Sequence, residues 1–291
     1  MSDGYSGIGG IHHVTAMAGD AQANYDFYTG VLGLRLVKRT VNFDDPGTYH
    51  LYYGDGLGRP GTILTFFPWP NAAKGRAGLG QVVETTLAIP TGALAYWRHR
   101  LSEAGALTSE PDANVPVRFA DQDGMRYVLV EEGGEGEDFG PVPSQYAIKR
   151  IVGVTLGSTR PDATNALLRE IAQENTAQVY PDETLARGSS GPGAVHHVAF
   201  RVASDEAQAE WHEKLSALGL NVTPVQDRQY FHSIYFREPG GVLFEIATDP
   251  PGFATDEPAE TLGHGLMLPP WLEKHRTDIE AGLPPLVIEH H

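Results

Sequence analysis

The sequence contains no cysteine, which excludes disulfide cross-links and thiolate metal sites. Any transition metal would therefore be bound by nitrogen and oxygen, which twelve histidines and 37 Asp and Glu residues can supply. Lys and Arg form no dense run, and the net charge of −16 repels nucleic-acid phosphates and anionic lipid. No window of eighteen apolar residues is present, and the start lacks the basic and then apolar order of a signal peptide. We therefore expect a cytoplasmic protein with neither nucleic acid nor a membrane as its partner.

The chain is long enough for a substantial core, and internal similarity indicates that repeats build it. It has 291 residues, of which 41% are hydrophobic. Four segments each open with a strand-like run and continue with a helix pattern, and the runs begin at Gly10, Val82, Arg150 and Ala194. Short alternating strands follow, some joined by Pro-Gly turns. The repeating unit is thus a strand, a helix and several strands, and the third unit looks short because residues 184–193 are polar and rich in glycine.

Composition also suggests where the chain divides. Residues 131–144 are dense in Gly, Glu and Pro, as a linker would be. This predicts an N-terminal domain over residues 1–135, a C-terminal domain over 145–255, and a tail over 256–291 that packs across other units or a partner subunit. We expect Asp20, Thr91 and Ser204 to cap the helices of units one, two and four.

Paired histidines distinguish the first and last units. His12-His13 and His196-His197 occupy the same place in their opening strands, and the other two units have no histidine there. This asymmetry favours a site assembled between units one and four. Neighbouring strand residues point to opposite faces, so only one histidine of each pair should face a given cavity. Because His196 shares a face with apolar residues, we assign His197 to the cavity, and His13 by its place in the repeat.

The last strand of unit four supplies a carboxylate by the same argument. Alternate residues from Val242 onward form its apolar face, so Glu245 lies on the opposite face. Two histidines and one carboxylate leave open positions for substrate and oxygen on Fe(II), and Mn(II) accepts the same ligands. We therefore predict a metal site formed by His13, His197 and Glu245. Aligning the Pro-Gly turns of units one and four places Thr65 where Glu245 lies, so unit one adds no fourth carboxylate.

Two further histidines are candidates for proton transfer. His50 and His232 occupy matching places in later strands of units one and four, where either could act as acid or base near the cavity. A partly exposed strand histidine without a chemical role is an equally good interpretation. Arg228 follows Asp227, so a surface ion pair is the simplest interpretation of these two residues alone.

The sequence motifs resemble a known family. The opening GIHHVT, the stretch over residues 37–70, and the HHVAF and PGGVLFE pieces look like ring-cleaving dioxygenases of the vicinal oxygen chelate superfamily, especially the hydroquinone-cleaving extradiol type. The resemblance covers most of residues 8–255. It implies an α+β fold of four βαβββ-type repeats paired into two vicinal oxygen chelate modules, with curved mixed sheets around a metal cavity.

The resemblance also implies roles for individual residues. It implies that Fe(II) is bound by His13, His197 and Glu245, in agreement with the strand argument. Four further residues would surround the metal: His12, His196, Arg228 and Tyr235. The implied reaction opens a hydroquinone- or catechol-like aromatic diol with O₂. Tyr235 would hydrogen-bond the bound phenolate, Arg228 would stabilise negative charge, and His196 or His232 would move the proton.

Two other functions stay open. A glyoxalase-like isomerase or lyase using Ni or Zn would resemble this fold, but such enzymes commonly present four ligands, and Thr65 counts against a fourth. A non-catalytic small-molecule binding protein of the same superfamily would need no metal, and the matched histidine pairs argue against it. A homo-oligomer is compatible with the sequence.

Overall fold

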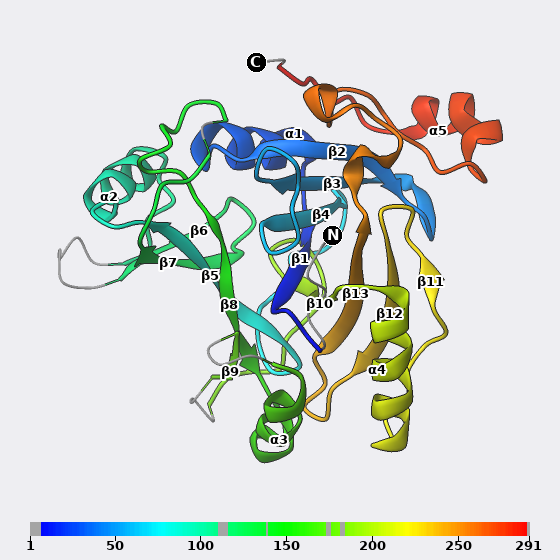
Figure 1. Cartoon of the computed structure of the whole chain (residues 1–291). Coiled ribbons are helices and arrows are strands. Elements are labelled where there is room, and N and C mark those ends of the chain that lie inside the picture. The colour runs from blue at the N-terminus through cyan, green and yellow to red at the C-terminus, as the bar shows by residue number, and fades with distance from the viewer. Residues whose placement is uncertain (1–6, 110–115, 138, 173–175, 181–183, 290–291) are drawn as a thin grey trace.

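Two mixed β-sheets form the framework of the computed structural model, which describes residues 7–109, 116–137, 139–172, 176–180 and 184–289 (Figure 1). The strands of the larger sheet are β1 (Ile11–Ala18), β2 (Arg35–Asn42), β3 (Asp45–Gly54), β4 (Ile63–Pro68), β10 (Val195–Val202), β11 (Gln226–Asp227), β12 (Phe231–Arg237) and β13 (Leu243–Pro251). The strands of the smaller sheet are β5 (Gln81–Pro90), β6 (Val117–Ala120), β7 (Arg126–Glu132), β8 (Arg150–Gly157) and β9 (Ala177–Val179).

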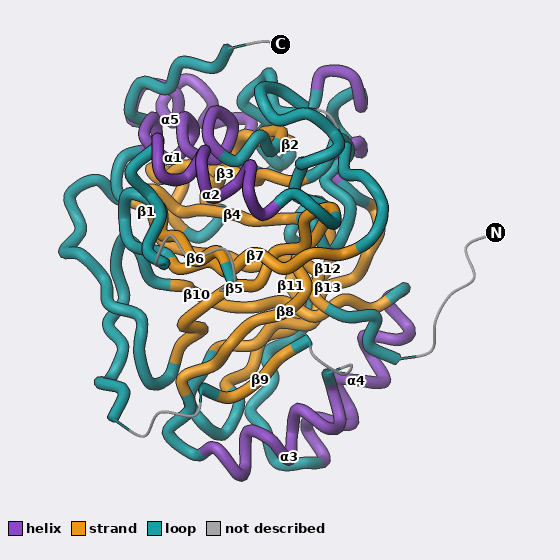
Figure 2. The backbone as a smooth tube through the Cα atoms, turned by 90° about the vertical axis from the view of Figure 1, so that its left-hand side faces the viewer, coloured by secondary structure: helices purple, strands orange, loops and turns teal. Residues whose placement is uncertain are grey.

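Helices lie on both sides of these sheets, as Figure 2 shows. They are α1 (Ala21–Tyr25), its π-helical continuation η1 (Asp26–Val31), α2 (Leu94–Glu103), α3 (Pro161–Ile171), α4 (Asp205–Ala217), α5 (Arg276–Gly282) and the 3-10 turns η2 (Phe253–Thr255), η3 (Ala259–Thr261) and η4 (Glu273–His275). The caps predicted at Asp20 and Ser204 are confirmed, because each side chain accepts a hydrogen bond from a first-turn backbone N–H. The cap predicted at Thr91 is wrong: Glu131 from β7 accepts from the backbone N–H of Gly92 at 2.7 Å just before α2 begins.

The strand order brings units one and four together. The larger sheet runs β11-β12-β13-β10-β1-β4-β3-β2, so it joins unit four to unit one through the antiparallel pair β1 and β10. On either side of this pair, β4 lies parallel to β1 and β13 lies parallel to β10, which gives the two halves the same arrangement. The smaller sheet, β6-β7-β5-β8-β9, joins units two and three in the same way through β5 and β8.

These pairings confirm the predicted α+β fold with mixed sheets built from four related units. Unit three is the short one, with β8, α3 and β9 as its elements among the described residues. Each sheet combines one unit from either side of the predicted linker. The sheets therefore connect the two halves of the chain. The division into domains over residues 1–135 and 145–255 stays a prediction.

Both faces of the larger sheet are buried, but in different ways. Val198, Phe200 and Val202 of β10 point into the main hydrophobic core with no exposed surface. Ala199, between them, belongs to a second and smaller apolar cluster on the opposite face, together with Tyr52 and other aromatic residues. The alternation of side chains along β10 thus separates the packing face from the face that carries the site.

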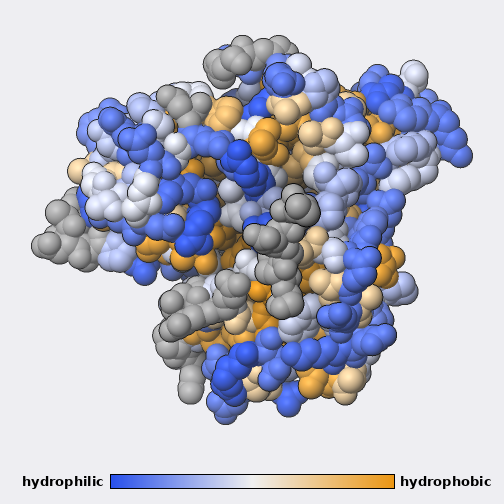
Figure 3. Space-filling model, viewed as in Figure 1, coloured by the Kyte–Doolittle hydropathy of each residue, from blue (hydrophilic) through white to orange (hydrophobic). Residues whose placement is uncertain are grey.

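The C-terminal tail packs along the outer edge of unit one. Its backbone pairs with the edge strand β2, where the N–H of Met267 donates to the carbonyl of Arg39 at 2.9 Å. Lys38 of β2 is fully buried and forms ion pairs with Asp256 at 2.7 Å and Glu257 at 2.8 Å. Figure 3 shows a largely hydrophilic surface over α5 and much of this face of the molecule. No helix of the described ranges has the length and apolar character to span a bilayer.

Candidate metal centre

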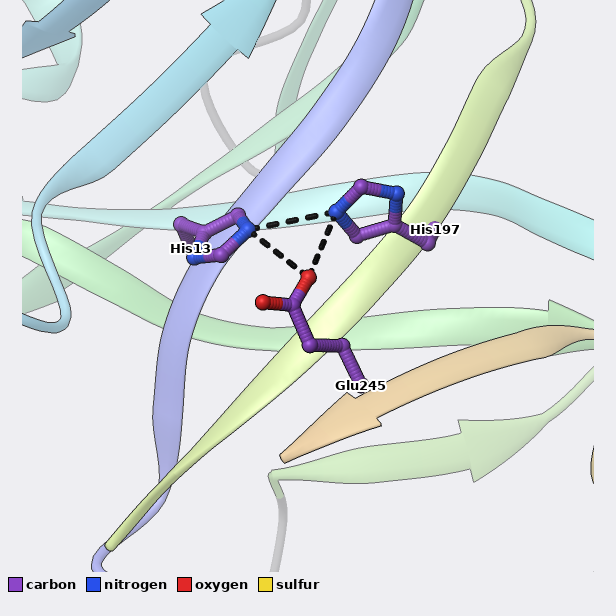
Figure 4. Close-up of side chains that lie close together, drawn as sticks. All are labelled: His13, His197 and Glu245. Carbon is purple, nitrogen blue, oxygen red and sulfur yellow. Dashed lines mark hydrogen bonds and ion pairs between the residues drawn. The ribbon is translucent and has the colours of Figure 1, made fainter. Parts of the chain in front are cut away.

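Three side chains from adjacent strands converge on one point. His13 of β1, His197 of β10 and Glu245 of β13 point toward one another (Figure 4). The two Nε2 atoms of the histidines lie 3.2 Å apart, and Oε2 of Glu245 lies 3.3 Å from His13 Nε2 and 2.8 Å from His197 Nε2. All three residues are buried. The strand argument therefore selected three residues that the fold brings within ligand distance of a common centre.

The polar atoms of this cluster fit a bound cation. Glu245 is fully buried, its Oε1 accepts a hydrogen bond from the Ser233 hydroxyl, and its Oε2 has no hydrogen-bond donor apart from the two imidazoles. Burial by itself would raise the pKa of Glu245, but His13 and His197 beside it hold that pKa well below its usual range. Burial lowers the pKa of His197, which keeps this ring neutral. One carboxylate and two imidazole nitrogens with a shared centre form a metal-binding triad.

A β-bulge lies at each histidine pair. Along the β1 and β10 pairing, the register skips His12 between Ile11 and His13, and it skips His196 between Val195 and His197. Bulges place an extra residue in one strand, turn its side chain and often lie next to active sites. The extra residue is the first histidine of the pair in both strands.

The bulges bring both rings of each pair into contact. His12 Nδ1 lies 2.9 Å from His13 Nδ1, and His196 Nδ1 lies 2.7 Å from His197 Nδ1. In both pairs, the first ring therefore contacts the nitrogen of the second ring that faces away from the metal centre. The expectation that one histidine of each pair faces the cavity is correct for His13 and wrong for the second pair, because both His196 and His197 line the cavity.

A cavity of about 450 Å³ opens beside the triad. Residues of units one and four form its walls, and His13 and His197 lie in its lining. Its aromatic lining residues are Phe43, Tyr52, Phe67, Trp69, Phe231 and Tyr235. A largely aromatic wall with polar groups at defined places is typical of sites for flat small molecules. Three aromatic residues at the end of β4 lie in different places: Phe66 packs in the main core, and Phe67 and Trp69 line the cavity.

Arg228 and Tyr235 lie together on the unit-four side of the cavity. Arg228 Nε donates to the Tyr235 hydroxyl at 3.2 Å, and its guanidinium lies 5.4 Å from the centre of the Tyr235 ring. Its Nη1 reaches Asp44 Oδ2 of unit one at 3.0 Å. The next residue, Gln229, has a left-handed backbone with a φ of 67°, and its N–H is held by Asp227 at 2.7 Å. Asp227 therefore shapes the turn. The ion-pair partner of Arg228 is Asp44, and not Asp227 as the sequence suggested.

The structure places His50 and His232 in different surroundings. His50 lines the cavity, with Nδ1 2.8 Å from the Tyr52 hydroxyl and Nε2 2.5 Å from the Thr65 hydroxyl. His232 points away from the cavity, and its Nδ1 lies 2.7 Å from Asp205 at the start of α4. The predicted matching of His50 with His232 is wrong. Strand pairing places Tyr52 opposite Thr65 and Tyr235 opposite Glu245, so the two tyrosines correspond, and His232 lies one residue further from its tyrosine than His50 does.

The correct correspondence reveals a residue that the sequence argument missed. Counting two positions back from each tyrosine matches His50 with Ser233. Each of these two residues contacts the side chain opposite its tyrosine: His50 contacts Thr65, and Ser233 contacts Glu245. Tyr235 lines the cavity, and Ser233, two residues before it on β12, lies on the same face of the strand. This alternation was the available signal for Ser233.

Comparison with known proteins identifies the family of this chain. The model of the Glyoxalase/Bleomycin resistance protein/Dioxygenase superfamily matches residues 10–246. A protein of Bacillus subtilis with the name "Putative ring-cleaving dioxygenase MhqO" is 48% identical, and the similarity covers 96% of this chain and 97% of that protein. The chlorohydroquinone/hydroquinone 1,2-dioxygenase of Sphingobium indicum is 32% identical, with 91% and 93% covered.

Solved structures include one that is similar to this chain in both sequence and fold. A crystal structure of a dioxygenase of Bacillus subtilis, described as "putative", superposes with a TM-score of 0.91 at 45% identity, and covers 99% of this chain and all of that one. Glyoxalase I of Zea mays, at 12% identity and a TM-score of 0.59 over 82% of this chain, shares the fold alone. The chain, with its buried His13, His197 and Glu245, therefore belongs to the glyoxalase/bleomycin resistance protein/dioxygenase superfamily and is a full-length homologue of ring-cleaving dioxygenases.

Proposed function

We propose that this protein is an Fe(II)-dependent, extradiol-type dioxygenase that opens a hydroquinone- or catechol-like ring with O₂. The observation that carries this proposal is the three-ligand triad beside an aromatic-lined cavity. A facial set of two histidines and one carboxylate is the ligand set of non-haem Fe(II) oxygenases. The relative of Sphingobium indicum supports the hydroquinone class through its name.

Iron bound by the triad would supply the redox chemistry that lets O₂ react with an electron-rich ring. The protein's contribution begins with holding the ligands. A ring nitrogen that binds metal carries no proton, so His13 and His197 would be protonated at Nδ1 and would donate to the Nδ1 atoms of His12 and His196. Such outer contacts fix the orientation of ligand rings. We therefore assign His12 and His196 this positioning role.

Tyr235 and Arg228 would act on the substrate's oxygen. The Tyr235 hydroxyl accepts a hydrogen bond from Arg228, so its own proton is available for a substrate oxygen. Burial raises the pKa of Tyr235, which keeps this hydroxyl protonated as a donor. Arg228 lies behind it and would stabilise negative charge that develops on a phenolate. The two residues would thus orient and polarise the diol without a change in their own charge.

Proton transfer requires a titratable side chain that faces the cavity. His196 lines the cavity, and its ring lies edge-on to that of Phe67 with 6.0 Å between the two ring centres. It can therefore reach a diol that packs against that aromatic wall. We assign the proton-moving role to His196: its Nδ1 would accept from His197, so its Nε2–H would be the proton that it donates. His232 does not share it, since its ring is paired with Asp205 outside the cavity lining.

The isomerase alternative gains no support from the fourth-ligand position. Thr65 is fully buried, and its hydroxyl contacts His50 at 2.5 Å and Thr15 at 3.3 Å. A hydroxyl that is held in this way offers no charged ligand, so the metal would be bound by three protein groups.

Oxygen uptake by anaerobically Fe(II)-loaded protein tests the proposal. We expect uptake with hydroquinones or catechols, loss of both bound iron and uptake in His13→Ala, and slower uptake with iron retained in Tyr235→Phe. His99→Ala is the control, because His99 lies exposed on α2 and pairs only with Glu103 in the described contacts. Iron-loaded protein that takes up no oxygen with any dihydroxylated ring would refute the dioxygenase assignment.

A further inference from the structure

One ion pair crosses the mouth of the cavity. Asp44 lies in the turn between β2 and β3 of unit one, and Arg228 lies just before β12 of unit four. Their carboxylate and guanidinium meet at 3.0 Å, and both residues line the cavity. The Asp44 side chain is 72% exposed and the Arg228 side chain 20% exposed, so Asp44 is the outer member of the pair.

Arg228 is the only Lys or Arg among the described cavity-lining residues, and Asp44 is the only Asp or Glu. Apart from the metal, a carboxylate on an incoming ring would find one cationic side chain to pair with, and that guanidinium is already occupied on two edges. Its Nε contacts Tyr235 and its Nη1 contacts Asp44. A ring carboxylate at Arg228 would lie beside the Asp44 carboxylate, and like charges at such short range repel.

We propose that Asp44 is a specificity-determining residue that reserves the cavity for uncharged dihydroxylated rings and disfavours rings that carry a carboxylate. The inference rests on the proposed function and names which substrates of that class are excluded. A neutral diol meets no such cost, because its hydroxyls can accept from or donate to the pair without displacing either charge. Asp44 acts from outside the metal centre, so its removal should change selectivity and leave metal retention unaltered.

The test compares hydroquinone with 2,5-dihydroxybenzoate, which is the same ring with a carboxylate. Both are measured with wild type, Asp44→Asn and Asp44→Glu, through kcat/KM of the iron-loaded protein. Dissociation constants for the metal-free protein are measured as well, from the fluorescence of Trp69 in the cavity wall. We expect Asp44→Asn to shift both ratios toward the carboxylated ring by about 5-fold, which corresponds to about 1 kcal/mol. Asp44→Glu should restore the wild-type ratio, and Glu210→Gln on the exposed face of α4 should leave it unchanged.

The shift should also shrink at high salt, since the exposed Asp44 charge is screened there. A ratio in Asp44→Asn within about 2-fold of wild type, or an equal shift in Asp44→Glu, would overturn the role of Asp44. Absence of turnover with both rings and with every other hydroquinone and catechol tested would instead overturn the proposed function, and the binding ratios of the metal-free protein would still decide the role of Asp44.

Discussion

Replacing Glu245 with glutamine separates the metal-binding role of this residue from its structural role. Glutamine has nearly the same volume, and its amide oxygen can still accept from the Ser233 hydroxyl. The change removes the buried negative charge that lies 2.8 Å from His197 and 3.3 Å from His13. The two imidazoles hold the pKa of Glu245 low, so the ionised carboxylate contributes stability that the metal-free variant loses, and the effect of metal must be measured within each variant.

The effect on metal binding follows from the ligand count. Loss of an outer contact to a ligand typically costs 10–100-fold in affinity, so loss of the charged ligand should cost at least about 100-fold. At a metal concentration of about 100 times the wild-type Kd, binding stabilises the wild type by about 2.7 kcal/mol and the variant by only about 0.4 kcal/mol. These values correspond to a rise in Tm of roughly 4–5 °C against roughly 1 °C.

Thermal unfolding with and without Mn(II), which is stable in air, measures both quantities in one series. Glu210→Gln serves as the control for loss of one negative charge on an exposed helix position. A Glu245→Gln variant that shows the full metal-dependent rise in Tm and one bound metal per chain would refute the triad.

Three further predictions concern the hydrogen bond to Glu245, the buried ion pairs of Lys38 with the C-terminal tail, and the pH dependence of metal binding. Ser233→Ala should weaken metal binding about 10-fold, since Glu245 Oε1 loses its hydrogen bond; calorimetry measures this, and an unchanged Kd would contradict it. Lys38→Met should lower stability by about 3 kcal/mol, and Tm by roughly 5 °C, because Asp256 and Glu257 lose a fully buried cation; a Tm within about 2 °C of wild type would show that solvent compensates them. Metal should stay bound as the pH falls through about 6.5, the ordinary pKa of histidine, because burial lowers the pKa of His197 and protons compete poorly for it. Equilibrium dialysis between pH 8 and 5 with metal analysis measures this, and half-release at or above about pH 6.5 would contradict it.

The repeats and the strand alternation carried most of what the sequence could predict. Four units were recognisable from their opening strands, and the histidine pairs confined to units one and four indicated which units adjoin. Alternation along β13 placed Glu245 opposite the apolar residues, and this argument needs only one regular strand. The triad was predictable because its three residues differ from the pattern around them.

The rest depended on irregularities that leave no mark in the sequence. The bulges at His12 and His196 add a residue that the partner strand does not match, so a period of two cannot be carried across them. The pairing of β12 with β13 also shifts between Phe231 and Ser233. An alignment that matched His50 with His232 was therefore offset by one residue, which reverses the face of the side chain.

The corrected alignment explains why a symmetric framework carries an asymmetric site. Units one and four present equivalent strands, but Thr65 and His50 of unit one stand where unit four has Glu245 and Ser233. The pair in unit four leaves an anionic oxygen free toward the centre, while the pair in unit one bonds its hydroxyl to imidazole at 2.5 Å. Unit four therefore supplies two of the three ligands, and unit one supplies His13 together with an uncharged residue, Thr65, at the position that corresponds to Glu245. A metal held by the triad would gain no ligand from Thr65, and that difference would leave room beside it for substrate and O₂.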